Sequence, residues 1–110
     1  MARAETNWET QMRKGLSEYF VMLVLAASPA HGYKIASDLR ELEIFDMGEG
    51  TLYPLLARLT ARGFIKPAWA TDGPGAARKV YSLTSQGRRE LSRMKALWRK
   101  LNDSQNLLGG

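Results

Sequence analysis

The sequence predicts a mainly α-helical fold with a small β-ribbon: a winged helix-turn-helix with one added C-terminal helix. Two observations lead to this fold class. Three helical patterns come first, and two short extended runs with a turn-rich loop between them precede a last helical pattern. At 110 residues, the chain is long enough for one domain with a single small core.

The first two helices should build most of that core. Residues 8–27 form the first, and its second half is apolar nearly all round, as in a central helix. Pro29 ends it, because proline disfavours the helical conformation in the residue before it. Residues 32–42 form the second helix, with Ile35 and Leu39 turned inward, and residues 43–50 are a connector.

The third helix lies in the segment EGTLYPLLARLTARGFI, residues 49–65. Apolar residues recur there at helical spacing: Leu52, Leu55, Leu56 and Leu59. Gly63 should close this helix as its C′ residue. Pro54 is tolerated in a first turn, where the backbone N–H has no partner, so the helix should begin near residue 50 or 51.

Residues 64–70 and 78–83 should form the β-ribbon, joined by a loop over residues 71–77 that is longer than a tight hairpin needs. Pro67 has no N–H for a ladder, so the first of these strands is expected at an edge. Thr84 is a good N-cap for the last helix, which should reach about Asn102 or a little beyond.

Composition excludes several classes of function. The chain has no cysteine and one histidine, His31, which has no partner at metal-ligand spacing and should instead help to begin the second helix. Without a suitable carboxylate pair or a phosphate-binding glycine loop, we expect no enzyme, no catalytic residue, no metal and no cofactor. The longest apolar run, residues 19–27, is too short to span a bilayer, so a cytoplasmic protein without a membrane partner is expected.

Charge is distributed unevenly along the chain. Residues 1–50 hold five Lys/Arg against eight Asp/Glu (net −3), and residues 51–110 hold eleven against three (net +8). This asymmetry favours a nucleic-acid surface in the second half. A solvated basic surface without a partner is the alternative.

The third helix has the composition of a helix that enters a DNA major groove. Its projected outer face is small, with Pro54, Ala57 and Ala61 opposite the leucines. Basic and hydroxyl groups flank that face, as contacts to phosphates and base edges require: Thr51, Arg58 and Arg62 on one edge and Tyr53 on the other. Tyr53 should add discrimination between specific and random DNA. Short side chains chosen for helix propensity are the alternative explanation.

Arg78 and Lys79 follow the loop of the ribbon. From that position they can reach backbone phosphates, which adds affinity independent of sequence.

Three segments resemble the signature segments of the PadR family of bacterial transcriptional regulators: HGYKIASDL (31–39), GTLYPLLARLTARGFI (50–65) and ARKVYSLTSQGRREL (77–91). The resemblance runs from about residue 11 to residue 100 and is greatest to the smaller subfamily with a single helix after the wing. It implies a homodimeric DNA-binding repressor, often released from its operator by a small molecule. It also implies that Tyr33 and Lys34 lie next to the DNA backbone, although Tyr33 has a half-buried core aromatic as its alternative.

The sequence departs from the family pattern in two places. Val80 and Ser82 stand where a tyrosine and an arginine are frequent, and Ala76 and Ala77 replace a stretch that is often basic or contains proline. These departures imply a weaker contact between wing and DNA.

The last helix carries a heptad-like apolar seam, which we call the C-terminal seam: Leu91, Met94, Trp98 and Leu101. A partner chain should cover it with residues of its first helix: Trp8, Met12, Leu16 and Tyr19. Packing within one chain is the alternative. Residues 1–83 would thus form the first helix and the DNA-binding winged helix-turn-helix, and residues 84–110 a dimerisation helix with a frayed tail, all in one compact unit.

The resemblance to one branch of the family also implies a ligand pocket between subunits. Trp98 matches a tryptophan that stacks on flat aromatic ligands there. The carried-over pocket would add residues of both terminal helices: Met12, Gly15, Glu18, Tyr19 and Asn102. Plain packing of Trp98 in a dimer is the alternative.

These patterns together predict a dimeric DNA-binding transcriptional regulator, a repressor that responds to a planar aromatic molecule. The alternative is a winged-helix module that binds protein, which leaves the basic second half without a purpose. A peripheral membrane protein would need a wider apolar face than the C-terminal seam.

Overall fold

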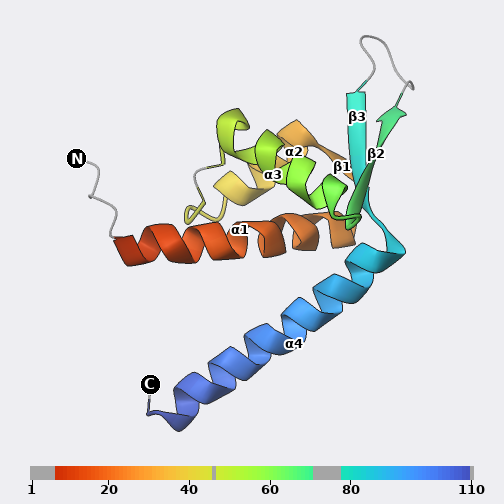
Figure 1. Ribbon diagram of the computed structural model, residues 1–110. Helices are drawn as coiled ribbons and strands as arrows, with labels where there is room; N and C mark the ends of the chain where they lie inside the picture. Colours follow the sequence, from red (N-terminus) through yellow and green to blue (C-terminus); the bar gives the residue numbers. More distant parts are fainter. Residues whose placement is uncertain (1–6, 46, 71–77, 110) are drawn as a thin grey trace, which may run out of the picture.

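The computed structural model describes residues 7–45, 47–70 and 78–109 (Figure 1). The predicted fold class is confirmed: the described chain is mainly helical with a small antiparallel sheet. The elements in order are α1 (Asn7–Ala27), β1 (Ala30–His31), α2 (Gly32–Arg40), α3 (Glu49–Ala61), β2 (Ile65–Ala70), β3 (Arg78–Leu83) and α4 (Ser85–Leu107). The predicted loop over residues 71–77, with Ala76 and Ala77, lies outside the described residues.

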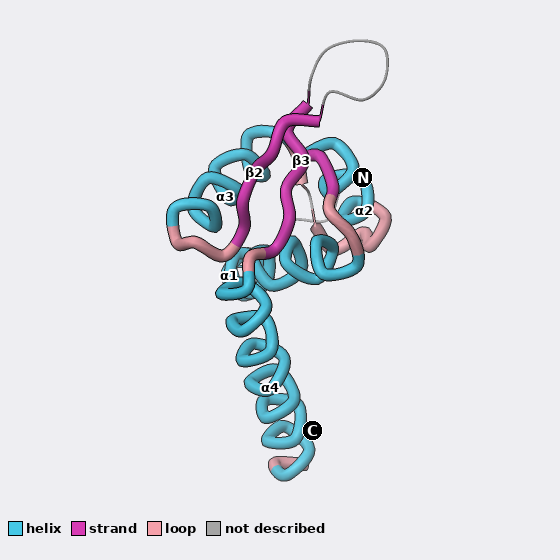
Figure 2. The backbone as a smooth tube through the Cα atoms, turned by 90° about the vertical axis from the view of Figure 1, so that its right-hand side faces the viewer, coloured by secondary structure: helices cyan, strands magenta, loops and turns pink. Residues whose placement is uncertain are grey.

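The sheet lies across one side of α1, α2 and α3, and α4 extends away from that body (Figure 2). The strand order of the sheet is β1-β3-β2, so β2, which contains Pro67, is an edge strand, as predicted. Strand β1 was not predicted. It is two residues long and pairs Ala30 with Tyr81 and His31 with Val80.

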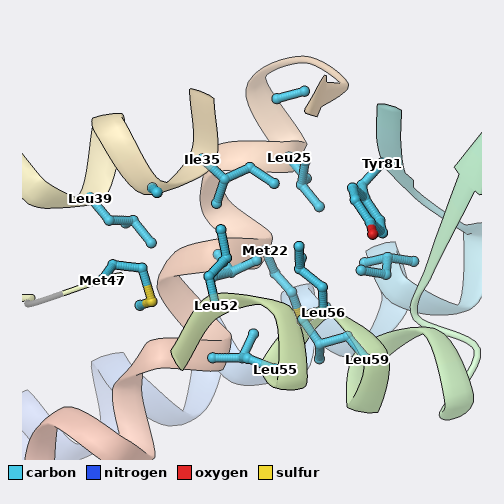
Figure 3. Packing of buried hydrophobic residues seen from close by; sticks show 14 of the residues in the cluster. Met22, Leu25, Ile35, Leu39, Met47, Leu52, Leu55, Leu56, Leu59 and Tyr81 are labelled. Atoms are coloured by element: carbon cyan, nitrogen blue, oxygen red, sulfur yellow. The ribbon is translucent and has the colours of Figure 1, made fainter. Parts of the chain in front are cut away.

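The core lies where α1, α2 and α3 meet the inner face of the sheet (Figure 3). All four leucines of α3 are buried there, as their spacing predicts. They pack with residues of the other elements: Met22 and Leu25 of α1, Ile35 and Leu39 of α2, and Ile65, Tyr81 and Leu83 of the sheet.

Two helix boundaries differ from the prediction. Helix α2 ends at Arg40, two residues early, because Glu43 adopts a left-handed φ of 63° that a helix does not continue. Helix α3 begins at Glu49, so Pro54 lies in its second turn and not in its first. The missing N–H of Pro54 therefore leaves the carbonyl of Gly50 without its helical donor, and Gly50 is exposed to water.

The start of α4 is fixed on the turn that links α3 to β2. Thr84 is the N-cap, as predicted: its Oγ1 accepts from the N–H of Gly87 at 2.9 Å and donates to the carbonyl of Gly63 at 2.6 Å. Gly63, with φ of 80°, is the left-handed C′ residue predicted for α3. Helix α4 then runs five residues beyond Asn102, to Leu107. None of the helices in the described ranges is long and apolar enough to cross a membrane.

Candidate nucleic-acid interface

Helix α3 presents a small outer face, which consists of Pro54, Ala57 and Ala61. All three residues are exposed and lie opposite the buried leucines. The assignment of buried and outer faces from the helical spacing of the sequence is therefore correct. A face without long side chains lets another surface approach the helix backbone closely. Thr51, which also is exposed, lies one turn before Leu55 on the edge nearest α1.

Tyr53 forms the other edge of α3 and leans towards the start of α2. A Cβ added to Gly32 would lie 2.8 Å from the Tyr53 hydroxyl, so a larger residue there would displace the Tyr53 ring. Tyr53 therefore bridges α3 and the first turn of α2 and is only partly free.

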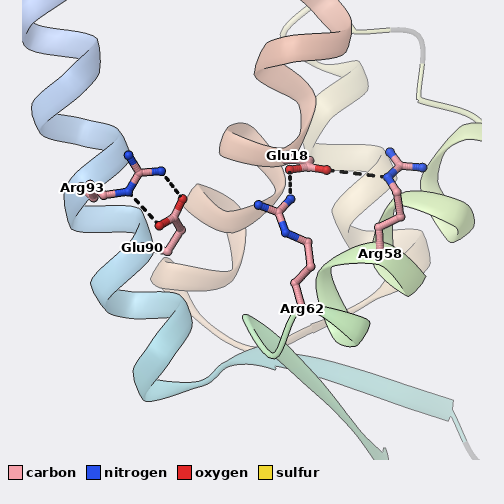
Figure 4. Close-up of polar contacts among 5 residues, drawn as sticks. All are labelled: Glu18, Arg58, Arg62, Glu90 and Arg93. Atoms are coloured by element: carbon pink, nitrogen blue, oxygen red, sulfur yellow. Dashed lines mark hydrogen bonds and ion pairs between the residues drawn. The ribbon is translucent and has the colours of Figure 1, made fainter.

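Arg58 and Arg62 lie on the α1 edge of α3, where both pair with one carboxylate of that helix (Figure 4). Arg62 Nη1 donates to Glu18 Oε2 at 3.0 Å, and Arg58 Nε lies 3.7 Å from Glu18 Oε1. The Arg62 guanidinium also lies 4.9 Å from the centroid of the Phe64 ring. Both arginines remain more than half exposed, so these pairs orient α3 on α1 more than they add stability.

The wing contributes cations from β3, as predicted. Arg78 and Lys79 are exposed at the far end of the strand. Lys79 pairs in register with Trp69 of β2, and its Nζ lies 5.6 Å from the centroid of the indole. This cation–π contact holds the ammonium group at the wing.

The start of α2 lies beside the wing. His31 is the N-cap of α2, because its Nδ1 accepts from the N–H of Lys34 at 3.3 Å, and this confirms the role expected for it. Tyr33 is 71% exposed, so the alternative of a half-buried core aromatic is wrong. Lys34 pairs with Asp38 one turn on, at 2.7 Å, which offsets part of its charge.

A second candidate site is the groove between α1 and α4, with a volume of about 600 Å³. Four of the six predicted ligand residues line it: Met12, Gly15, Tyr19 and Trp98. The rings of Tyr19 and Trp98 lie 6.5 Å apart inside one chain. The other two residues do not line this groove: Glu18 faces α3 instead, and Asn102 is exposed further along α4.

The C-terminal seam, which lies on α4, divides into two halves. Leu91 is 4% exposed and belongs to the core of its own chain, and Met94 packs against that core. The alternative of packing within one chain therefore holds for this first half. Trp98 and Leu101 line the groove with Trp8 and Leu16 of α1, and all but Leu16 are exposed.

An ion pair on α4 lies near the α1–α3 bridge (Figure 4). Arg93 donates two hydrogen bonds to Glu90, at 2.7 and 2.9 Å. These bonds hold the pKa of Glu90 below its ordinary value, and the nearby charge of Arg62 adds to the effect. The side chain of Gln86 also donates to the Arg62 carbonyl at 3.4 Å, so α3 and α4 meet at this point.

The model of the transcriptional regulator PadR-like family matches residues 21–93 of the chain. The protein belongs to this family. The matched range contains α2, α3, the sheet and the first turns of α4, which are the elements that build the candidate interface.

Solved structures of PadR-like proteins share this fold over nearly the whole chain. A PadR-like transcription factor from Bacteroides fragilis is 39% identical, with a TM-score of 0.79, over 94% of this chain and 99% of that one. A PadR-like transcriptional regulator from Bacillus cereus is 29% identical, with a TM-score of 0.82, over 91% and 98% of the two chains.

Curated relatives are more distant or longer. A 37.1 kDa protein in a transposon of Streptomyces fradiae is 34% identical over 82 residues, which are 74% of this chain but only 23% of that protein. A protein of Lysinibacillus sphaericus is 25% identical over 92 residues, 82% of this chain and 84% of its own length.

The sequence did not identify three residues of this PadR-like protein that lie at the candidate interface. Gly32, Trp69 and Tyr81 line one hollow together with Tyr53, Arg78 and Lys79. For Trp69 and Tyr81 the only signal in the sequence was the alternation along the ribbon, which places both on the same face as the core residues Ile65 and Leu83.

Proposed function

We propose that the protein is a homodimeric repressor that places α3 in the major groove of an operator and its wing against the backbone. The observation that carries the proposal is the exposed outer face of α3, which is small and has cationic groups at one edge and on the adjacent wing. The net charge of +8 over residues 51–110 supports the same partner.

Dimerisation is proposed through the second half of α4. Large apolar side chains are exposed there: Leu97, Trp98, Leu101, Leu107 and Leu108. A second copy would cover them, since a lone surface helix with this much exposed apolar area favours association.

A planar aromatic effector is proposed for the α1–α4 groove. The volume of the groove, about 600 Å³, lies within the range of ordinary ligand pockets. Tyr19 and Trp98 offer two aromatic faces to a ligand there.

Binding to duplex DNA should depend steeply on salt. If each dimer neutralises about six phosphates, affinity should fall about a thousandfold between 50 and 200 mM salt, because the slope of log K against the logarithm of the salt concentration is about −0.9 per phosphate. Duplexes selected from genomic DNA by the purified protein serve as ligands, and fluorescence anisotropy measures affinity. Failure of the protein to retain any genomic duplex, or affinity that is independent of salt, would favour the protein-binding module instead.

Planar aromatic dyes should quench tryptophan emission at low micromolar concentration, an order of magnitude typical of ligand pockets. The chain has three tryptophans, of which Trp69 lies on the wing and away from the groove. Quenching should therefore persist in Trp69→Phe and largely disappear in Trp98→Ala, with light scattering used to check that both variants remain dimeric. Equal quenching in both dimers would place the dyes outside the groove.

A further inference from the structure

One carboxylate of α1 lies between two arginines of α3 (Figure 4). Glu18 uses both of its oxygens: Oε2 accepts from Arg62 Nη1 at 3.0 Å, and Oε1 lies 3.7 Å from Arg58 Nε. Two guanidinium groups and one carboxylate give this group of three a net charge of +1, where the arginines alone would have +2. Much of the positive charge at the α1 edge of α3 is therefore neutralised within the free protein.

Glu18 holds the two arginines with different strength. Arg62 donates a hydrogen bond to Glu18, and its guanidinium also lies 4.9 Å from the centroid of the Phe64 ring. Arg58 makes no hydrogen bond to any residue that the structure describes, so only the attraction of opposite charges across 3.7 Å holds it. Arg62 thus fixes the position of the carboxylate, whereas Arg58 can exchange the carboxylate for another anion.

Arg58 lies beside the face of α3 that would meet DNA. It lines a hollow of about 400 Å³ together with Thr51 and Pro54, and Pro54 belongs to the outer face. The Arg58 side chain is 59% exposed, against 23% for that of Glu18. The contact with Glu18 runs through Nε, which leaves both Nη groups of Arg58 as donors for a phosphate (Figure 4).

We propose that Glu18 is an autoinhibitory counter-charge: its carboxylate, held in place by Arg62, competes with DNA phosphates for the guanidinium of Arg58. An interaction that exists in the free protein and is lost in the complex lowers the affinity of that complex. The competition weakens binding to every duplex, because phosphates carry no sequence information. This inference rests on the proposed function.

Glu18→Gln tests the competition, because it keeps the shape of the side chain and removes the charge. Affinity for the selected duplex and for random duplex should each rise about fivefold, as expected when one exposed ion pair is lost in each subunit of a dimer. Asp103→Asn is the matched control, since it removes one negative charge from an exposed position on α4. Its affinity should remain within about twofold of the wild type.

A double-mutant cycle shows whether Glu18 acts through Arg58. In the Arg58→Gln background, Glu18→Gln should change affinity by less than about twofold, because no guanidinium remains for the carboxylate to withhold. A rise as large as in the wild-type background would mean a general effect of charge and would overturn the proposal. Unchanged or lower affinity of the single variant Glu18→Gln would also overturn it, because that result is expected if Glu18 only orients α3 on α1.

A measurement on the wild type is independent of the folding of any variant. In isotope-labelled protein, the Nε resonance of Arg58 should shift when random duplex is added, and that of Arg62 should move much less, since only Arg58 changes its partner. An Arg58 resonance that stays in place in the bound protein would overturn the proposal while DNA binding stands. If neither the wild type nor Glu18→Gln binds any duplex, the proposed function fails, and this inference fails with it.

Discussion

Replacing Gly87 by alanine is expected to destabilise the protein by about 3 kcal/mol or more, at the upper end of the usual cost of overpacking. A Cβ at this position would clash with the backbone of Phe64, because it would lie 1.9 Å from the carbonyl oxygen and 2.8 Å from the carbonyl carbon of that residue. Gly87 is buried in the first turn of α4, where the helix meets the α3–β2 turn.

Phe64 has little freedom to move away. Its N–H donates to the Leu59 carbonyl and its own carbonyl accepts from the N–H of Thr84, both at 3.0 Å. The first turn of α4 would have to separate from the turn instead, and the two hydrogen bonds of the Thr84 hydroxyl would be strained with it.

Gly50→Ala is the matched control, since Gly50 also lies in the first turn of a helix but has no atom within 4 Å of an added Cβ. Its stability should be unchanged or up to about 1 kcal/mol higher, because alanine is the better helix former. Urea unfolding at one protein concentration measures both variants. Equal stability of the two variants would mean that α4 does not dock on Phe64 as described.

Replacing Ala57 by glutamate is expected to lower affinity for duplex DNA at least about tenfold, or 1.4 kcal/mol, without loss of stability. Ala57 lies in the middle of the outer face of α3. In the proposed complex, a longer side chain there separates the helix from the groove, and its carboxylate meets phosphates and base acceptors. Glutamate is a good helix former, so the exposed position should tolerate it.

Ala96→Glu provides the control for this substitution. Ala96 is exposed on α4, and the same change there alters net charge equally without touching α3. Its affinity for DNA should remain within about twofold, because exposed charges more than a Debye length away are screened. Anisotropy titrations at one salt concentration compare the two variants with the wild type. If Ala57→Glu binds as tightly as Ala96→Glu, α3 does not enter the groove.

The sequence by itself determined the elements and their faces. The spacing of the leucines in α3 set which side is buried, because a helix repeats every 3.6 residues whatever surrounds it. Gly63 and Thr84 marked a helix end and a helix start through local backbone and side-chain preferences, and both act as expected. Pro67 likewise confined β2 to an edge.

Only the tertiary structure decided contacts between residues distant in the chain. Strand β1 is too short to have a pattern of its own and exists because β3 pairs with it. Arg62 meets Glu18 across 44 positions, and Tyr53 meets Gly32 across two helices. Leu91 has the spacing of a dimer seam yet is buried in its own chain. Periodicity specifies which face of a helix is apolar, but the partner that covers the face depends on how the elements pack.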